Sequence, residues 1–248
     1  MSPSPHDAST DLQRAAALLD LAIAAPTAAF VARVYGRRAA ARYALALGGG
    51  LALQHAFLRV IRSAAGPEPA SPADLLTHSR ATTGSVLAGL VAAGVRDRTG
   101  AAGRLAWAGT LVAVTASDWL DGPLARRAGP TRLGRALDIE ADSWLTLWSV
   151  AAAVAWGALP RWCLLPPLLR YGQPLLDARD GRLPAGGGPG WSRAAGTAQM
   201  LLVAAALAPF RRPGRARLLD RLAAPVSAAQ GATMFVLLRR RWRGMGGR

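Results

Sequence analysis

Residues 118–142 read DWLDGPLARRAGPTRLGRALDIEAD and place four aspartates beside two apolar runs. Asp118 and Asp121 are three residues apart, and Asp138 and Asp142 are four apart, so each pair projects from one face of a helix. Burying an unpaired carboxylate is costly, so four of them in an apolar setting require a cation. Oxygen ligands favour Mg²⁺ or Mn²⁺ over zinc. The stretch therefore predicts a site for two divalent cations.

A second interpretation pairs these aspartates with nearby arginines at a solvated membrane boundary. The arginines available in the same stretch are Arg126, Arg127, Arg132 and Arg135. An acidic residue inside a membrane or at its boundary is costly to keep there, and such residues usually serve a function. For all four aspartates together, we therefore favour metal binding over simple ion pairing.

Composition indicates a membrane protein. The chain has 248 residues, 52% of them hydrophobic, and a formal net charge of +16. The charge comes from arginine alone, and the arginines cluster between apolar runs instead of interleaving with exposed aromatic residues,. This argues against a nucleic-acid partner. Cys163 is the only cysteine, which excludes an internal disulfide, a cysteine-rich zinc site and a CxxC redox pair,.

Apolar windows predict the fold class. A bilayer core needs about 20 mostly apolar residues per helix, because lipid offers the backbone no hydrogen-bond partner. Six windows meet or approach this length and predict an all-α, polytopic six-helix transmembrane bundle with an extra N-terminal helical region. The fourth contains Pro166, Pro167 and Arg170, so we expect a kinked or short helix there. The windows are residues 75–95, 102–121, 138–158, 160–177, 194–210 and 219–238.

Arginine-rich segments orient the predicted bundle. The connector 122–137 contains four arginines and no acid, and the C-terminal tail RRRWRGMGGR is also basic. The positive-inside rule places both on the cytoplasmic side. This predicts a multi-pass protein of the cell membrane with its aspartates near the cytoplasmic face. The connector 211–217, with four arginines, disagrees with this orientation.

The N-terminal region allows two arrangements. Residues 15–32 and 43–58 are either two further spans or a helical pair lying in the membrane interface, and Asp20, Pro26 and the glycine run 48–50 favour the interface,. We expect a disordered start before them and a linker, SAAGPEPASPA, at 63–73. The expected parts of the chain are an N-terminal extension at 1–71, a transmembrane domain at 72–240 and a basic cytoplasmic tail at 241–248.

The aspartate stretch also resembles a known signature. The pattern Asp118-x2-Asp121-Gly122-x2-Ala125-Arg126-x7-Gly134-x3-Asp138-x3-Asp142 is similar at every fixed position to that of the CDP-alcohol phosphatidyltransferase (CDP-alcohol phosphotransferase) family. Residues 72–84, PADLLTHSRATTG, resemble the family's PNxLTxxR stretch, with Asp74 where asparagine is usual. The resemblance covers about residues 72–240.

The resemblance implies an activity in phospholipid biosynthesis. Family members are integral membrane enzymes of six helices, usually homodimers, that displace CMP from a CDP-alcohol with an acceptor alcohol. We expect CDP-diacylglycerol as the donor and membrane lipids around the protein. By matching positions, Asp118, Asp121 and Asp138 would hold two Mg²⁺ or Mn²⁺ ions. Asp142 would sit in the same metal site and act as the catalytic base for the acceptor hydroxyl.

Candidate nucleotide-binding residues are mostly small or cationic. Small side chains let a nucleotide approach the backbone, although they also mark helix packing in membranes. Arg126 either pairs with the diphosphate or braces an aspartate. Two further candidates match family positions near the nucleotide end of the first helix. The full set is Gly122, Ala125, Arg126, Gly134, Thr77 and Arg80.

Arg170 and Arg193 are the candidates for acceptor binding, together with the glycine-rich loop DGRLPAGGGPG between them. Arginine suits an acceptor that bears a phosphate. GWSRAAGTAQM, residues 190–200, is similar to the GKxKTxxQM stretch of glycerophosphate-type members, with Arg193 in place of lysine. Glu140 lies outside the signature, and we expect it to be solvated or salt-bridged.

Two alternative functions remain. A membrane prenyltransferase also binds diphosphate with aspartates and magnesium, but its motifs are expected in two segments well apart in sequence, and this chain has one aspartate cluster. A non-enzymatic membrane scaffold would pair its aspartates with loop arginines. Such a scaffold would tolerate aspartate-to-asparagine changes with little loss beyond stability.

Overall fold

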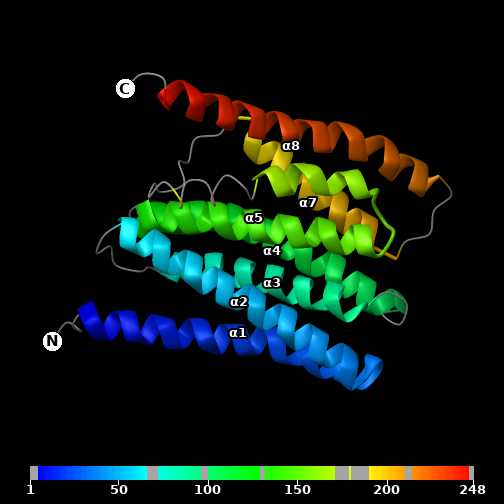
Figure 1. Cartoon of the computed structure of the whole chain (residues 1–248), viewed down its shortest axis with the longest axis horizontal. Helices are drawn as coiled ribbons and strands as arrows, with labels where there is room; N and C mark the ends of the chain where they lie inside the picture. The colour runs from blue at the N-terminus through cyan, green and yellow to red at the C-terminus, as the bar shows by residue number, and fades with distance from the viewer. Residues whose placement is uncertain are drawn as a thin grey trace.

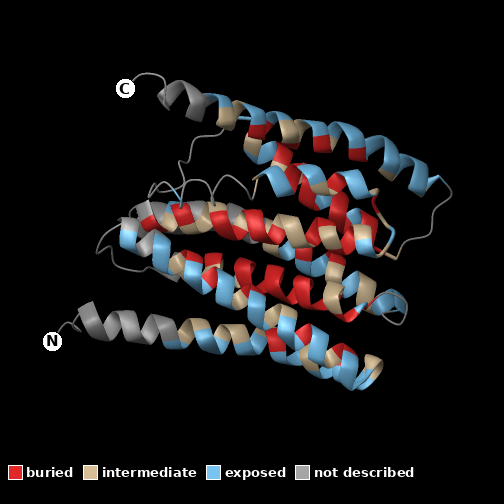
Figure 2. Cartoon of the chain, in the orientation of Figure 1, coloured by how far each residue is buried: buried red, intermediate tan, exposed pale blue. Residues whose placement is uncertain are grey.

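Helix α3 lies in the interior of the helical bundle and packs against four other helices (Figure 1). It contacts α1, α2, α4 and α5, while α7 packs against α4, α5 and α8. Every residue from 80 to 90 is buried, so α3 is enclosed on all sides (Figure 2). The elements are α1 (Pro5–Tyr35), α2 (Arg37–Ala65), α3 (Pro72–Ala93), α4 (Gly100–Ala128), α5 (Arg132–Ala155), the 3₁₀ helix η1 (Arg161–Leu164), α7 (Ser192–Leu207) and α8 (Arg215–Met245).

The computed structural model describes residues 5–65, 72–95, 100–128, 132–170, 179, 190–209 and 214–245. Side chains are described over a narrower set, which is 14–60, 63, 74–95, 100–116, 133–170, 179, 190–209 and 214–239. No strand occurs in the described backbone. The prediction of an all-α fold is therefore confirmed for these residues.

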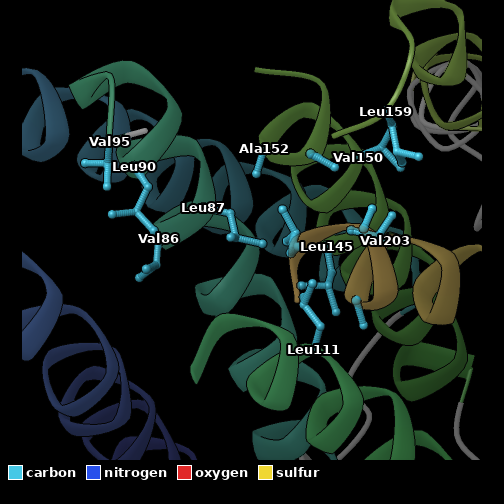
Figure 3. Close-up of a cluster of buried hydrophobic side chains, with 14 of the residues drawn as sticks. Val86, Leu87, Leu90, Val95, Leu111, Leu145, Val150, Ala152, Leu159 and Val203 are labelled. Carbon is cyan, nitrogen blue, oxygen red and sulfur yellow. The ribbon is translucent and has the colours of Figure 1, made fainter. Parts of the chain in front are cut away.

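The apolar core lies between α3, α4, α5 and α7. Figure 3 shows Leu87 of α3, Leu111 of α4, Leu145 of α5 and Val203 of α7 within one cluster, and each is at most 3% exposed. Such contacts stabilise the association of the helices through close van der Waals packing. The fit of these surfaces therefore sets how the helices associate.

Glycines allow α2, α3 and α5 to approach one another closely. A Cβ atom at Gly84 of α3 would lie 2.6 Å from Cδ1 of Trp144 and 3.2 Å from the backbone of Leu145 on α5. A Cβ atom at Gly89 would lie 2.7 Å from the ring of Tyr43 on α2. The two shorter separations, 2.6 and 2.7 Å, are closer than real Cβ contacts, so neighbouring atoms would have to shift. The helices can pack this tightly only because these positions lack a side chain.

Helices α1 and α2 form a hairpin through a single residue, Gly36. Its φ angle of 82° lies in the left-handed region that favours glycine,. The hairpin packs on α3 through both helices and on α5 through α2. Tyr43 donates a hydrogen bond from its hydroxyl to the carbonyl oxygen of Ala24 at 3.3 Å and joins the two helices. Helix α1 is continuous through Pro26.

The predicted linker is only partly described. Helix α2 continues to Ala65 and α3 begins at Pro72, so both ends of the segment 63–73 are helical. Residues 66–71 lie outside the described part of the chain.

Each predicted apolar window coincides with a helical segment of the structure. The fourth begins as the 3₁₀ turn Arg161–Leu164 and becomes α-helical over residues 165–170, and residues 171–178 lie outside the description. Pro166 stands in the first turn of this α-helical segment, where its missing N–H group breaks no helical hydrogen bond. The prediction of a kinked or short helix stays a prediction, because the end of this segment lies outside the described residues.

Two helices in the described part of the chain are long and apolar enough to cross a membrane, Arg14–Tyr35 and Arg215–Arg239. The second covers the window 219–238. The other five windows do not reach this standard over the described residues. Helix α7 has 16 residues, fewer than the roughly 20 required,. The described side chains of α4 end at residue 116, and α5 carries several charges. Length and composition alone therefore do not establish the six-span arrangement.

We expect the substitution Gly84→Ala to lower the melting temperature of the protein in detergent. The new Cβ atom would clash with the side chain of Trp144 and the backbone of Leu145, and overpacking costs about 1–3 kcal/mol. Gly48→Ala is the matched control, because nothing lies within 4 Å of the added Cβ atom. Equal melting temperatures for the two variants would contradict the close packing of α3 on α5.

Candidate active site

One face of α5 carries both acidic residues among the described residues of the cavity wall. Arg135, Asp138, Asp142 and Thr146 follow one another at three- and four-residue spacings and line the same cavity,. The side chains of Asp138 and Asp142 are 43% and 31% exposed. Both carboxylates are therefore accessible to a ligand in the cavity.

Arg80 of α3 pairs with both of these aspartates. Its side chain is only 1% exposed. Nη2 donates to Oδ1 of Asp138 and also to Oγ1 of Thr77 at 3.2 Å, and Nε lies 3.4 Å from Oδ1 of Asp142. A buried guanidinium requires anionic partners, because removing a charge from water without one costs several kcal/mol. These contacts fix α3 against α5 at the site.

The cavity has a volume of about 370 Å³ and lies between α3, α4, α5, α7, α8 and the segment ending at Arg170. Part of its wall is polar and part is apolar. The polar groups from α7 and α8 are Ser192, Thr197, Gln230 and Thr233. The apolar groups include Val114, Leu145, Met200, Met234 and Leu237. A cavity of this kind suits a ligand with a polar head and an apolar tail.

Both arginines predicted for the acceptor side line this cavity. Nε of Arg170 donates to Oγ of Ser143 on α5 at 3.3 Å, which orients the guanidinium. Arg193 lies in the first turn of α7. The glycine-rich loop at 180–190 lies outside the described residues except for Gly190.

Arginines outnumber acids among the described residues that line the cavity. The four are Arg80, Arg135, Arg170 and Arg193, against the two aspartates of α5. Arginine binds phosphate through paired N–H groups, and several together create a positive potential. The cavity wall therefore favours anionic ligands.

The remaining signature residues fall at the end of α4. The backbone of α4 is helical to Ala128, but its side chains from residue 117 onward lie outside the description. The sequence-predicted residues concerned are Asp118, Asp121, Gly122, Ala125 and Arg126.

Two predicted nucleotide residues are not part of the cavity wall. Gly134 lies in the first turn of α5 and does not line the cavity. Thr77 is buried behind Arg80 and accepts its hydrogen bond. Thr77 therefore orients Arg80.

The donor atoms at the site are suited to a divalent cation. Asp138 and Asp142 supply carboxylate oxygens, and no histidine or cysteine occurs among the described lining residues. Oxygen-only ligands match Mg²⁺ or Mn²⁺. The described side chains contain no group of three acidic, histidine or cysteine residues that could hold a metal. The other two predicted ligands, Asp118 and Asp121, lie outside those side chains.

Sequence reasoning missed several lining residues. Arg135 stands three residues before Asp138 on the same helix, and this spacing was a usable signal,. Gln230 and Thr233 lie within the apolar window 219–238 and are at most 4% exposed. Polar residues in a predicted span mark functional positions more often than chance, so they too could have been selected.

The structure contradicts the expectation that Glu140 is solvated or salt-bridged. Its side chain is 3% exposed and accepts a hydrogen bond from Nε2 of Gln54 at 2.8 Å. Helix α2 covers this face of α5. The expectation was wrong because the segment containing Gln54 was not known to pack there.

Comparison with protein families identifies the chain. The family described as CDP-alcohol phosphatidyltransferase matches residues 71–237. The chain belongs to the CDP-alcohol phosphatidyltransferase family. Comparisons with curated proteins and with solved structures give no match. The matched range runs from just before α3 into α8, so α1 and α2 lie outside it.

Membership establishes the general activity. The protein is a membrane-associated transferase that moves a phosphatidyl group from a CDP-alcohol to an acceptor alcohol in phospholipid synthesis, and its family uses divalent metal ions. Membership therefore favours this activity over a prenyltransferase or a scaffold.

We expect Arg80→Lys to lower the turnover of the transferase about 100-fold, since misplacing catalytic groups by roughly 1 Å has an effect of this size. A lysine keeps the charge but cannot contact three acceptors from one planar group. Arg104→Lys is the control, because Arg104 donates to the carbonyl oxygen of Leu207 and does not line the cavity. The rate of CMP release measures both. Similar rates for the two variants would rule out a special role for Arg80.

Proposed function

We propose that the protein transfers the phosphatidyl group of CDP-diacylglycerol to the hydroxyl of an acceptor alcohol that carries an anionic group, and releases CMP. One observation supports this: the cavity is lined both by Asp138 and Asp142 of the family signature and by Arg170 and Arg193. A carboxylate next to a substrate hydroxyl can take its proton. Arginines facing the same space can bind a phosphate on the acceptor.

In the proposed reaction the acceptor oxygen attacks the phosphorus that carries diacylglycerol. A new phosphorus–oxygen bond forms, and the bond from this phosphorus to the bridging oxygen of the diphosphate breaks. The bridging oxygen leaves with CMP. Asp142 accepts the proton of the acceptor hydroxyl, while Arg80 positions Asp142 and Asp138.

The metal ligands we propose are Asp118, Asp121 and Asp138, with Asp142 in the same site, for two Mg²⁺ or Mn²⁺ ions. When bound, these ions neutralise negative charge on the phosphoryl group and on CMP. Val114 and Thr115 of α4 line the cavity. Asp118 follows them by four and three residues in sequence, which supports a place for the α4 aspartates at the same site.

For the nucleotide, we propose Gly122, Ala125 and Arg126 near the end of α4 and Gly134 at the start of α5. These residues flank the connector between two helices that both contribute to the cavity wall. Small residues there would let the nucleotide approach the backbone closely.

We further propose that residues 72–240 are a catalytic domain of six membrane spans, preceded by the extension 1–71 and followed by the basic tail 241–248. The arginines between α4 and α5 and at the C-terminus support a cytoplasmic active site in a multi-pass protein of the cell membrane,. We expect the enzyme to act as a homodimer, as the family resemblance implies.

Purified protein in detergent should release CMP from CDP-diacylglycerol when Mg²⁺ or Mn²⁺ and a suitable acceptor are present. Asp142→Asn should reduce this rate by about 100-fold or more, because general-base catalysis contributes on the order of 10²–10⁴-fold. Asp220→Asn, at an exposed position of α8 outside the cavity, is the control and should keep the wild-type rate. Near-native turnover of Asp142→Asn would exclude it as the base.

A panel of acceptors with and without phosphate tests the acceptor class. We expect Arg193→Gln to raise the KM for a phosphorylated acceptor about 10- to 100-fold, since a hydrogen bond to a charged group is worth about 1.5–3 kcal/mol. The KM for CDP-diacylglycerol should stay unchanged. Arg217→Gln, exposed in the first turn of α8, is the control. A preference for uncharged acceptors in the wild type would refute the anionic class.

A further inference from the structure

A buried hydrogen bond joins the N-terminal hairpin to the helix that carries the cavity aspartates. Gln54 of α2 donates from Nε2 to Oε1 of Glu140 on α5 at 2.8 Å. The two residues are 5% and 3% exposed. A buried donor or acceptor that loses its partner is strongly penalised, so this contact specifies one pairing of the two helices.

Apolar contacts on both sides of this bond extend the same interface. Phe57, three residues after Gln54, packs in one cluster with Leu133 and Ala136 of α5. Gly50, four residues before Gln54, lies so close to α5 that an added Cβ atom would be 3.3 Å from Cζ2 of Trp144. One stripe of α2, from Gly50 to Phe57, therefore follows α5 for about two turns,.

Glu140 and the cavity aspartates face opposite directions. Glu140 is two residues from both Asp138 and Asp142, which places it about 200° around the helix from each of them. One face of α5 thus contacts α2 while the other lines the cavity. Because an α-helix is rigid, a contact that fixes the first face also fixes the direction of the second.

We propose that the Gln54–Glu140 hydrogen bond positions the active site by holding the rotation of α5 about its own axis, and that the N-terminal hairpin is thereby part of the catalytic unit. Gln54 lies outside the range 71–237 that matches the family. The inference rests on the proposed function in one respect, namely that Asp138 and Asp142 act on substrates in the cavity.

A second contact holds the hairpin beside the same site. Oγ1 of Thr82 on α3 donates a hydrogen bond to Oδ1 of Asp20 on α1. This Asp20 oxygen also lies 2.8 Å from Nε2 of His78 on α3. Thr82 and His78 flank Arg80 in sequence. The hairpin therefore makes polar contacts with both helices that supply the Arg80 ion pairs.

Exchange of the two polar groups tests the hydrogen bond. Gln54→Glu would face one carboxylate with another and should lower kcat at least about 10-fold, given the steep dependence of rate on geometry. Glu140→Gln keeps a donor and an acceptor in the pair and should retain most of the activity. The double variant with Gln54→Glu and Glu140→Gln should restore kcat to within about twofold, because the two groups have only changed places. Leu53→Ala, at an exposed position beside Gln54, is the control.

Thiol labelling measures the rotation of α5 without any turnover. Thr146 lies on the cavity face of α5, four residues beyond Asp142, so Thr146→Cys provides a reporter. Cys163 is 0% exposed and serves as an internal control for unfolding. Peptide mass spectrometry after N-ethylmaleimide treatment separates the two thiols. The reporter should react severalfold more slowly with Gln54→Glu and recover with the double variant, while Cys163 stays protected.

Slower labelling and lower kcat in Gln54→Glu, both reversed by the exchange, would support the proposal. Unchanged labelling and kcat, or a folded double variant that recovers neither, would overturn it. If Cys163 becomes labelled in Gln54→Glu, that variant has unfolded. The variant Gln54→Asn, whose shorter side chain cannot reach Glu140, then replaces it, and its labelling rate and kcat test the proposal. If the wild type releases no CMP with any acceptor, the proposed function fails, and labelling alone decides whether the pair sets the rotation.

Discussion

The buried guanidinium of Arg80 is the constraint on which the rest of the site depends. A positive charge that is 1% exposed requires carboxylates close by, and Asp138 and Asp142 of α5 provide them,. Helices α3 and α5 must therefore lie side by side with these two residues directed toward α3. Gly84, one turn beyond Arg80, makes this separation possible because a side chain there would clash with Trp144.

The two faces of helix α5 have different surroundings: one lines the cavity, and the other packs against α2. On its cavity face, Asp138 and Asp142 pair with Arg80, and the same cavity is lined by Arg170 and by Arg193 of α7. Its opposite face is packed by α2 through Gln54 and Phe57. The family match begins at residue 71, yet the structure places a helix from before that point directly behind the aspartates. The extension is therefore integrated with the transferase fold.

The sequence predicted those features that depend on neighbouring residues. The four-residue spacing of Asp138 and Asp142 indicated one helix face, and both line one cavity in the structure. The apolar windows located the helices. Prediction was weaker where a side chain's role depends on another helix: Glu140 was expected to be solvated or salt-bridged but is buried against Gln54 of α2.

By itself, then, the sequence determined the all-α class, the positions of the helices and the family signature, because helix formation and the direction of a side chain around a helix follow from local spacing. Only the tertiary structure decided that Arg80 pairs with two aspartates, that Arg170 and Arg193 share their cavity, and that α2 covers the back of α5. These contacts join residues far apart in sequence, such as Gln54 and Glu140. They depend on which helix surfaces fit together, and no local pattern in the chain encodes that fit.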